Sequence, residues 1–303
     1  MRIIFYGTPE FAVESLKAIL STHHQVIAVV TAPDALGGRG RNQIIVSEVK
    51  KFAQSQNIQI LQPEKLRDQS FIKTLKELNA DIQVVVAFRM LPEQVWSMPP
   101  LGTINVHGSW LPKYRGAAPI HWAVINGEDE TGVTIFKLKH KIDTGDIILR
   151  ERLPIDINDT TGDVYLKLKK LGAQTLIKAL DLIESGKVLY QSQNEAESST
   201  APKLFHENAC IDIQKSSVEI HNFVRGLNPY PSAWMKLDGI KYFIHRTHLS
   251  NAANHMEKVA VGTFFKFNHE LYLRTKDGSL RVLEIQPEGK RKMTGSEFAT
   301  RLL

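Results

Sequence analysis

An amide and an imidazole stand two residues apart in one short apolar stretch. Ile104 and Val106 alternate there with Asn105 and His107, which is the pattern of a strand that carries two polar side chains on one face. Their Cα atoms would lie roughly 6 to 7 Å apart. An amide that donates to a developing oxyanion, beside an imidazole that exchanges a proton, suits acyl transfer. Taken alone, the pair could instead be structural, with the histidine satisfying a buried backbone group.

A carboxylate lies further along the chain, in the segment Ile142-Asp143-Thr144-Gly145-Asp146. Alternating strands are expected on both sides of it, over residues 131–138 and 147–153, as an antiparallel hairpin. On such a turn Asp143 could supply a catalytic carboxylate or simply cap the turn. The spacing alone leaves both roles open.

The first thirty residues have the pattern of a βαβ unit. Apolar strands at 2–6 and 26–30 flank a helix that begins near Pro9. The turn before the helix is Gly7-Thr8-Pro9 and not the G-x-G-x-x-G fingerprint, so Thr and Pro stand where the backbone would approach a pyrophosphate. We therefore expect an α/β fold with a Rossmann-like, doubly wound, mostly parallel sheet and no nicotinamide cofactor.

Two loops should meet at the carboxyl ends of the sheet strands. One, residues 108–119, is punctuated by Gly and Pro and follows the strand of the amide and imidazole pair. The other follows a buried strand at 81–87 and begins with Phe88, Arg89 and Met90. Because ligands in open α/β sheets bind outside the carboxyl ends of the strands, both loops should face one crevice.

The last third of the chain has a different pattern. A long amphipathic helix at 161–185 is followed by a polar stretch without periodicity, which marks a linker. Short strands with turns between them then suggest a small β-barrel, over residues 233–237, 241–245, 259–267, 271–275 and 280–285. The expected domains are a catalytic domain at 1–189, a linker at 190–206 and the barrel domain at 207–303.

Composition excludes several classes of protein. The 303 residues are 43% apolar and 23% charged, as in ordinary globular proteins, and no apolar run is long enough to span a membrane. No secretory leader pattern follows Met1. The single cysteine, Cys210, excludes a disulfide framework and a cysteine-based metal cluster. We expect a cytoplasmic, monomeric protein without a membrane partner and without a metal.

The positive charge is concentrated near the C-terminus. Residues 1–200 carry 23 Lys and Arg against 22 Asp and Glu, whereas residues 201–303 carry 15 against 10. A basic appendage on a nearly neutral body favours a nucleic-acid partner, since phosphate contacts supply most sequence-independent affinity. Surfaces that bind nothing can carry the same excess.

Two segments resemble a known enzyme family. Asn105-x-His107-Gly108-Ser109-x-Leu111-Pro112 and the following Tyr114-Arg115-Gly116-Ala117-Ala118-Pro119 are similar to the signature of the 10-formyltetrahydrofolate-dependent formyltransferases. Ile142-Asp143-Thr144-Gly145-Asp146-Ile147-Ile148 resembles the aspartate loop of the same family. The resemblance covers nearly the whole chain. It implies transfer of a formyl group from 10-formyltetrahydrofolate, a co-substrate, to the amine of initiator methionyl-tRNA, and an OB-like barrel at the C-terminus.

The resemblance also implies roles for numbered positions. Asn105 and His107 would stabilise the oxyanion, and Asp143 would orient His107 and assist removal of the proton. The donor pocket would be lined by Ser109, Trp110, Leu111 and Pro112, with Trp110 where the family more often has Leu. The pterin would contact the segment Phe88, Arg89 and Met90, which replaces a more usual Tyr-Gly pair.

Contacts to tRNA are expected from two basic segments. Residues 34–42 form a Gly-rich loop with a G-R-G core, and the resemblance places Arg39, with Arg41 beside it, at the acceptor end of the tRNA. The basic run near the C-terminus contributes Lys290 and Arg291. Both segments could equally be solvated surface.

Three other functions compete with this interpretation. A formyltransferase acting on a nucleotide-linked amino sugar would share the motif and a C-terminal barrel, and the G-R-G loop and basic tail argue against it. A hydrolase that takes formate from the same folate would not need the basic domain. A non-catalytic RNA-binding module would leave the Asn105, His107 and Asp143 set unexplained.

Overall fold

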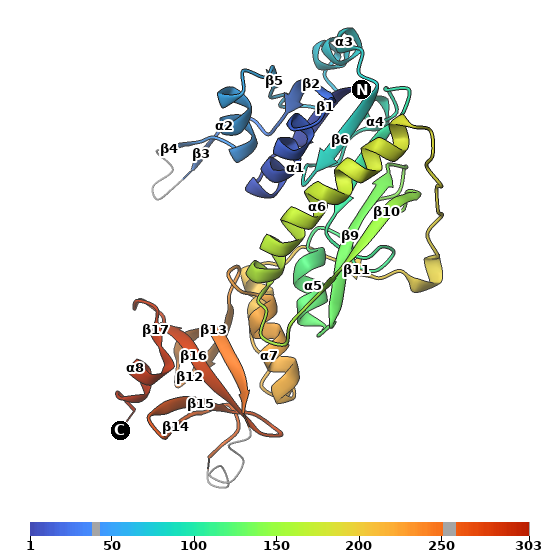
Figure 1. Ribbon diagram of the computed structural model, residues 1–303. Coiled ribbons are helices and arrows are strands. Elements are labelled where there is room, and N and C mark those ends of the chain that lie inside the picture. Colours follow the sequence, from blue (N-terminus) through green and yellow to red (C-terminus); the bar gives the residue numbers. More distant parts are fainter. Residues whose placement is uncertain (38–42, 251–258, 303) are drawn as a thin grey trace. The chain divides into compact units, whose positions relative to one another are not determined.

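The computed structural model describes residues 1–37, 43–250 and 259–302 (Figure 1). By their contacts the residues form two compact units. The first comprises residues 1–116, 132–153 and 165–200, and the second comprises residues 117–131, 154–164 and 201–303. No described helix is both long enough and apolar enough to cross a membrane.

The first unit is built on a seven-stranded sheet with the strand order β10-β9-β7-β6-β1-β2-β5. Strands from β7 to β5 pair in parallel, and β9 pairs antiparallel with β7. The expected Rossmann-like, mostly parallel sheet is confirmed. The strands are β1 (Arg2–Gly7), β2 (Gln25–Val30), β5 (Ile60–Leu61), β6 (Ile82–Val86), β7 (Thr103–His107), β9 (Glu130–Lys137) and β10 (Ile147–Pro154).

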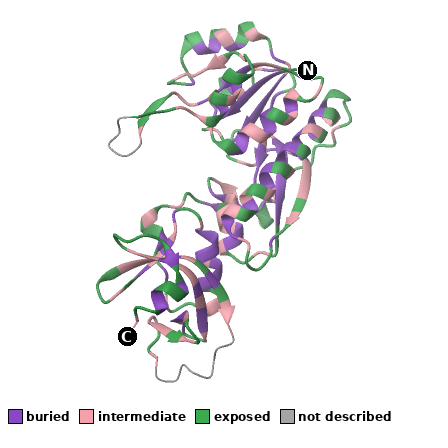
Figure 2. Ribbon diagram, turned by 60° about the vertical axis from the view of Figure 1, so that its left-hand side comes forward, coloured by how far each residue is buried: buried purple, intermediate pink, exposed green. Residues whose placement is uncertain are grey.

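Helices cover the sheet on both faces. On one face Phe71 and Leu75 pack with Tyr6 and Val85 of the strands. On the other, a Cβ added at Gly172 would lie 3.2 Å from Val106, which places that helix close against β7. Buried residues accordingly gather in the strands (Figure 2). The helices are α1 (Glu10–Leu20), α2 (Glu48–Ser55), α3 (Gln69–Leu78), α4 (Glu93–Trp96) and α6 (Thr161–Glu184).

A short hairpin interrupts the order of strands and helices after β2. It consists of β3 (Ala35–Gly37) and β4 (Gln43–Ile45), which pair antiparallel. Leu36, Ile44 and Ile45 are exposed on it. Arg39 and Arg41, expected to contact tRNA, lie outside the described residues.

The second unit contains a six-stranded antiparallel sheet with the order β12-β13-β16-β15-β14, and β17 pairs with β16. The expected strands are confirmed, but closure into a barrel is not, because among the described residues β12 and β14 are the two edges. The strands are β12 (Ala233–Leu237), β13 (Ile240–Ser250), β14 (Phe264–Phe267), β15 (Glu270–Arg274), β16 (Ser279–Pro287) and β17 (Met293–Thr294).

Two helices of the second unit pack closely together. A Cβ added at Gly226 would lie 2.4 Å from Ile125, so only glycine permits this approach of α7 (Ser217–Gly226) to α5 (Pro119–Ile125). Ile220 and Val224 of α7 enter the core of the sheet. The remaining short elements are β8 (Arg115–Gly116), η1 (Glu195–Glu197), β11 (Thr200–Ala201), η2 (His206–Ala209) and α8 (Gly295–Ala299).

Candidate active site

Strand β7 brings the amide and imidazole pair to the carboxyl edge of the sheet. His107 is its last residue, and Val106 pairs with Val86, the last residue of β6. The strand end expected from the alternating pattern is thus confirmed. The His107 side chain is buried and Asn105 is half-buried. Among the described residues the Asn105 amide forms no hydrogen bond, so it is available to a ligand at this edge.

The two nitrogens of the His107 ring have different partners. Nε2 lies 2.9 Å from the carbonyl oxygen of Tyr114. A carbonyl only accepts, so Nε2 carries a hydrogen and Nδ1 is the atom that gains or loses a proton. Nδ1 faces the Asp143 carboxylate, whose Oδ2 is 3.7 Å away. The structure therefore brings together the imidazole and the carboxylate from two separate turns.

The Asp143 turn is held close to the end of β9. A Cβ added at Gly145 would lie 1.6 Å from the carbonyl oxygen of Lys137, so this close approach requires glycine. Asp143 itself has the left-handed φ of 54°, which is uncommon for residues with a side chain. Its Oδ2 accepts a hydrogen bond of 2.8 Å from the backbone N–H of Gly116. This carboxylate is thus fixed by the loop that follows β7.

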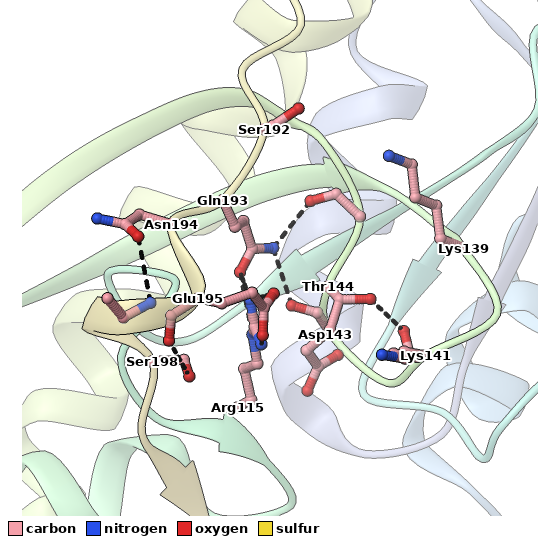
Figure 3. A network of polar contacts seen from close by, with 12 residues as sticks. Arg115, Lys139, Lys141, Asp143, Thr144, Ser192, Gln193, Asn194, Glu195 and Ser198 are labelled. Atoms are coloured by element: carbon pink, nitrogen blue, oxygen red, sulfur yellow. Dashed lines mark hydrogen bonds and ion pairs between the residues drawn. The ribbon is translucent and has the colours of Figure 1, made fainter.

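A polar network behind Asp143 was not expected from the sequence (Figure 3). The Gln193 amide donates to the carbonyl oxygens of Asp143 and Gly145, both at 2.8 Å. Its oxygen accepts from the Arg115 guanidinium at 2.8 and 3.1 Å. Arg115 also donates twice to the Glu195 carboxylate, at 2.9 Å each. No sequence pattern predicts a role for Gln193, because this residue lies in a polar stretch without periodicity.

The expected donor segment, residues 109–112, is firmly anchored in the first unit. The Ser109 hydroxyl donates to the carbonyl of Lys113 at 2.7 Å, and Leu111 is fully buried with Phe136 and Ile147. Pro112 is buried as well. The Ser109 hydroxyl and the Leu111 side chain are therefore engaged within the protein. So is much of the backbone, because the carbonyls of Ser109 and Leu111 accept from Thr134 and Arg150 and the Leu111 N–H donates to Thr134.

Trp110 is enclosed by arginines from β10. The guanidinium carbons of Arg150 and Arg152 lie 4.4 and 4.3 Å from the centre of its ring. Arg150 additionally donates to the carbonyl of Leu111 at 2.7 Å. Each cation faces the electron-rich ring, which is a favourable contact. The ring is thus occupied by protein groups in this structure.

Phe88, Arg89 and Met90, which begin two residues after the end of β6, differ in their surroundings. Phe88 packs edge-on against Tyr6, with 5.6 Å between ring centres. Arg89 donates to the backbone carbonyls of Pro63 and Glu64. Met90 is 74% exposed. Of the expected pterin contacts, Phe88 and Arg89 are held by neighbours and Met90 is open to solvent.

The basic residues near the C-terminus belong to the second unit. Lys290 and Arg291 are both exposed. The Arg291 guanidinium donates to Glu297 at 2.8 Å, and the neighbouring Lys292 pairs with Glu284 at 2.6 Å. Carboxylates thus neutralise part of the positive charge of this run.

One group among the described residues has the spacing of metal ligands. The ligand atoms of His23, His24 and Glu184 lie within 4.8 Å of one another, beside the amino-terminal end of β2 and away from the carboxyl edge. The amine of Met1 lies 3.3 Å from Nδ1 of His24 and 3.2 Å from Glu184. The Met1 ammonium group is thus a cation already bound at this cluster, and we do not propose a metal site there.

Comparison with known sequences identifies both parts of the chain. The sequence model described as formyl transferase matches residues 1–180, and that of the formyl transferase C-terminal domain matches residues 203–303. A protein named methionyl-tRNA formyltransferase from Azobacteroides pseudotrichonymphae genomovar. CFP2 is 46% identical, with 98% of this chain and 94% of that protein covered. One of the same name from Flavobacterium johnsoniae is 44% identical, at 98% and 95% coverage.

Solved structures share the fold at lower identity. WlaRD, described as a sugar 3N-formyl transferase in the presence of dTDP and 5-N-formyl-THF, superposes with a TM-score of 0.69 at 24% identity, covering 96% of this chain and 99% of that one. HypX from Aquifex aeolicus, in complex with tetrahydrofolic acid, gives 0.64 at 16% identity, covering 98% and 46%. From the family models and the curated relatives, the chain belongs to the formyl transferase family, among the methionyl-tRNA formyltransferases.

Proposed function

We propose that this protein transfers the formyl group of 10-formyltetrahydrofolate to the free amino group of initiator methionyl-tRNA. The observation that carries the proposal is that His107, at the end of β7, lies 3.7 Å from the Asp143 carboxylate, with Asn105 two residues earlier in the same strand. Full-length relatives named methionyl-tRNA formyltransferase, at 42 to 46% identity, support the choice of acceptor.

The chemistry follows from the groups at this edge. The amine attacks the formyl carbon, and the carbonyl electrons move onto oxygen to give a tetrahedral oxyanion. The Asn105 amide, which has no hydrogen-bond partner in the described part of the chain, would donate to that oxygen, and such donation is a large term in acyl transfer. The proton released by the attacking nitrogen would pass to Nδ1 of His107.

His107 would then return the proton to the leaving nitrogen. As the tetrahedral intermediate collapses, the bond from carbon to N10 of the folate breaks and N10 gains the hydrogen. Asp143 would stabilise the transient imidazolium, because its Oδ2 faces Nδ1. The distance of 3.7 Å is longer than a hydrogen bond, so Nδ1 can still accept a proton from the attacking nitrogen.

The folate would bind between the two loops at the carboxyl edge. A folate-derived donor is consistent with the family and with the folates present in WlaRD and HypX. In this proposal, residues 109–112 and the segment Phe88, Arg89 and Met90 form the donor site. In this proposal no metal and no nicotinamide takes part, since Asn105 polarises the carbonyl and His107 moves the proton.

The acceptor would be held by the basic parts of the chain. The proposed contacts are Arg39 and Arg41 with the acceptor end of the tRNA, and Lys290 and Arg291 with its backbone, because guanidinium and ammonium groups bind phosphates. We keep the catalytic domain at 1–189, the linker at 190–206 and an OB-like tRNA-binding domain at 207–303. The proposal includes a cytoplasmic monomer, since charged tRNA is used there by the ribosome.

A single assay tests the proposal. The full-length protein is incubated with 10-formyltetrahydrofolate and charged initiator tRNA, and formyl-methionine is measured after release from the tRNA. A dTDP-linked amino sugar serves as the second acceptor, and folate without acceptor tests for hydrolysis. Formyl-methionine without sugar formylation is the expected result. Product from the sugar alone, or free formate alone, would overturn the proposal.

A further inference from the structure

We propose that Gln193 and Arg115 are positioning residues that hold the Asp143 carboxylate against His107. The inference rests on the proposed function, since it concerns the same carboxylate. It adds a role for the polar stretch around Gln193, in which no sequence motif indicates chemistry. Four hydrogen bonds of the Gln193 side chain carry the argument, two through its nitrogen and two through its oxygen.

The turn needs such a support because its backbone is unfavourable by itself. Asp143 has a φ of 54°, a region that side-chain-bearing residues rarely adopt unless their surroundings enforce it. The carbonyls of Asp143 and Gly145 both accept from the one amide nitrogen of Gln193, at 2.8 Å each. This pair of bonds crosses the turn and fixes the direction in which the Asp143 side chain leaves it.

Arg115 determines which way the Gln193 amide faces. A guanidinium only donates, so the amide oxygen must point toward Arg115, and its NH₂ group must then point toward the two carbonyls. The contacts to that oxygen are 3.1 and 2.8 Å long. Glu195 holds the other side of the guanidinium through two bonds of 2.9 Å. Figure 3 shows this series of contacts from Glu195 through Arg115 and Gln193 to Asp143.

The residue next to Arg115 also bonds the Asp143 carboxylate directly. Gly116, the residue after Arg115, donates its backbone N–H to Oδ2 of Asp143 at 2.8 Å. Arg115 itself donates its backbone N–H to the carbonyl of Ser199 at 2.9 Å. Gly116 thus bonds the carboxylate of Asp143, and Arg115 holds the Gln193 amide that bonds its backbone. A shift of Arg115 and Gly116 would therefore move the carboxylate relative to His107.

The four members of the network differ in exposure, and this predicts a graded response. The Arg115 side chain is 11% exposed and that of Glu195 is 73% exposed. Exposed ion pairs are weakened by solvent and contribute little. Loss of Glu195 should therefore matter less than loss of Gln193, whose side chain bonds the turn directly.

The test compares Gln193→Ala with a matched control in the same segment. Gln191→Ala removes the same side chain from a residue that accepts from Arg150 and does not contact the turn. Misplacement of a catalytic group by about 1 Å can cost roughly 10²-fold in rate, so we expect kcat of Gln193→Ala to fall by about tenfold or more. KM for folate and for methionyl-tRNA should be unchanged, and Gln191→Ala should retain wild-type kcat.

A double-mutant comparison separates positioning from general damage. If Gln193 acts through Asp143, its removal should cost almost nothing in an Asp143→Asn background, because groups that act as a unit are not additive. A full additional loss in that background, or near-wild-type kcat for Gln193→Ala alone, would overturn the inference.

Failure of this inference differs from failure of the proposed function. If wild-type protein forms no formyl-methionine, the proposed function fails before any variant is compared. If the wild type is active, and both Gln193→Ala and a variant of the second positioning residue, Arg115→Lys, are as active as the wild type, only the positioning role fails. Thermal unfolding of each variant, with Gln191→Ala as reference, identifies any that do not fold.

Discussion

Nδ1 of His107 and Oδ2 of Asp143 lie 3.7 Å apart, although 36 positions separate the two residues in the sequence. This distance is longer than a hydrogen bond and short enough for a strong electrostatic interaction. Because Nε2 is engaged with the carbonyl of Tyr114, a proton gained at Nδ1 would face the carboxylate. The pair therefore forms a site where an imidazole can accept a proton and be stabilised while it carries it.

Removal of either polar side chain at the carboxyl edge should reduce turnover and spare folate binding. Asn105→Ala and His107→Ala should each lower kcat by roughly 10²-fold or more, because the first removes the oxyanion donor and the second removes the group that moves the proton. Folate affinity, measured by equilibrium titration, should stay near that of the wild type because both residues act on the reacting carbonyl. Near-normal kcat in both variants would refute their assignment.

Replacement of Trp110 should affect stability more than catalysis. Its ring lies 4.4 and 4.3 Å from the guanidinium carbons of Arg150 and Arg152, so Trp110→Leu should lower the free energy of unfolding by about 1 to 3 kcal/mol. Urea unfolding measures this change, and Trp110→Phe should recover part of it. A raised KM for folate with unchanged stability would instead mean that the ring contacts the donor.

The local pattern was sufficient for most elements of the fold. Alternation of Ile104, Asn105, Val106 and His107 predicts a strand that ends at His107, and the structure ends β7 there. The strand from Ala233 to Leu237 also has the expected bounds. The alternation reflects which side chains face the core, so a strand can be predicted from residues adjacent in the sequence. Closure of the C-terminal sheet depends on pairing between distant strands, and local pattern could not decide it.

The site was predictable only where a motif carried it. Asn105, His107 and Asp143 stand in segments with family-like spacing. Gln193 lies in a polar stretch whose residue types are those of an exposed linker. Its partner Arg115 is 78 positions away in the sequence, so their contact has no local signal. The burial of Ser109 and Leu111 in the core, with their carbonyls accepting from Thr134 and Arg150, could be seen only in the structure.

Acid should destabilise the second unit through one buried and two half-buried histidines. Nδ1 and Nε2 of His221 lie 2.9 Å from the hydroxyl of Thr247 and the carbonyl of Ile157, and burial lowers the pKa of His221. Burial likewise lowers the pKa of His121 and of His245. Each would bind a proton more readily when unfolded, where the pKa is about 6.5.

The sign of this effect follows from the direction of the shifts. Below about pH 6.5 the unfolded chain binds more protons than the folded chain, so the free energy of unfolding should fall as the pH decreases through that range. His221→Gln should flatten the dependence, although it costs stability at neutral pH. Urea unfolding at several pH values checks this, and an unchanged slope in the variant would contradict the role of His221.

Gly145 offers a steric test of the Asp143 turn. A Cβ there would lie 1.6 Å from the backbone oxygen of Lys137, which cannot rotate away. Gly145→Ala must therefore displace the turn, and a displaced carboxylate should cost roughly 10²-fold in kcat. Gly186→Ala is the matched control, since Gly186 has a φ of 67° with no atom within 4 Å of the added Cβ. Both variants should lose stability, by about 1 to 3 kcal/mol, yet only Gly145→Ala should lose turnover. Equal kcat in the two, measured with formyl-methionine as product, would mean that the position of this turn does not limit the reaction.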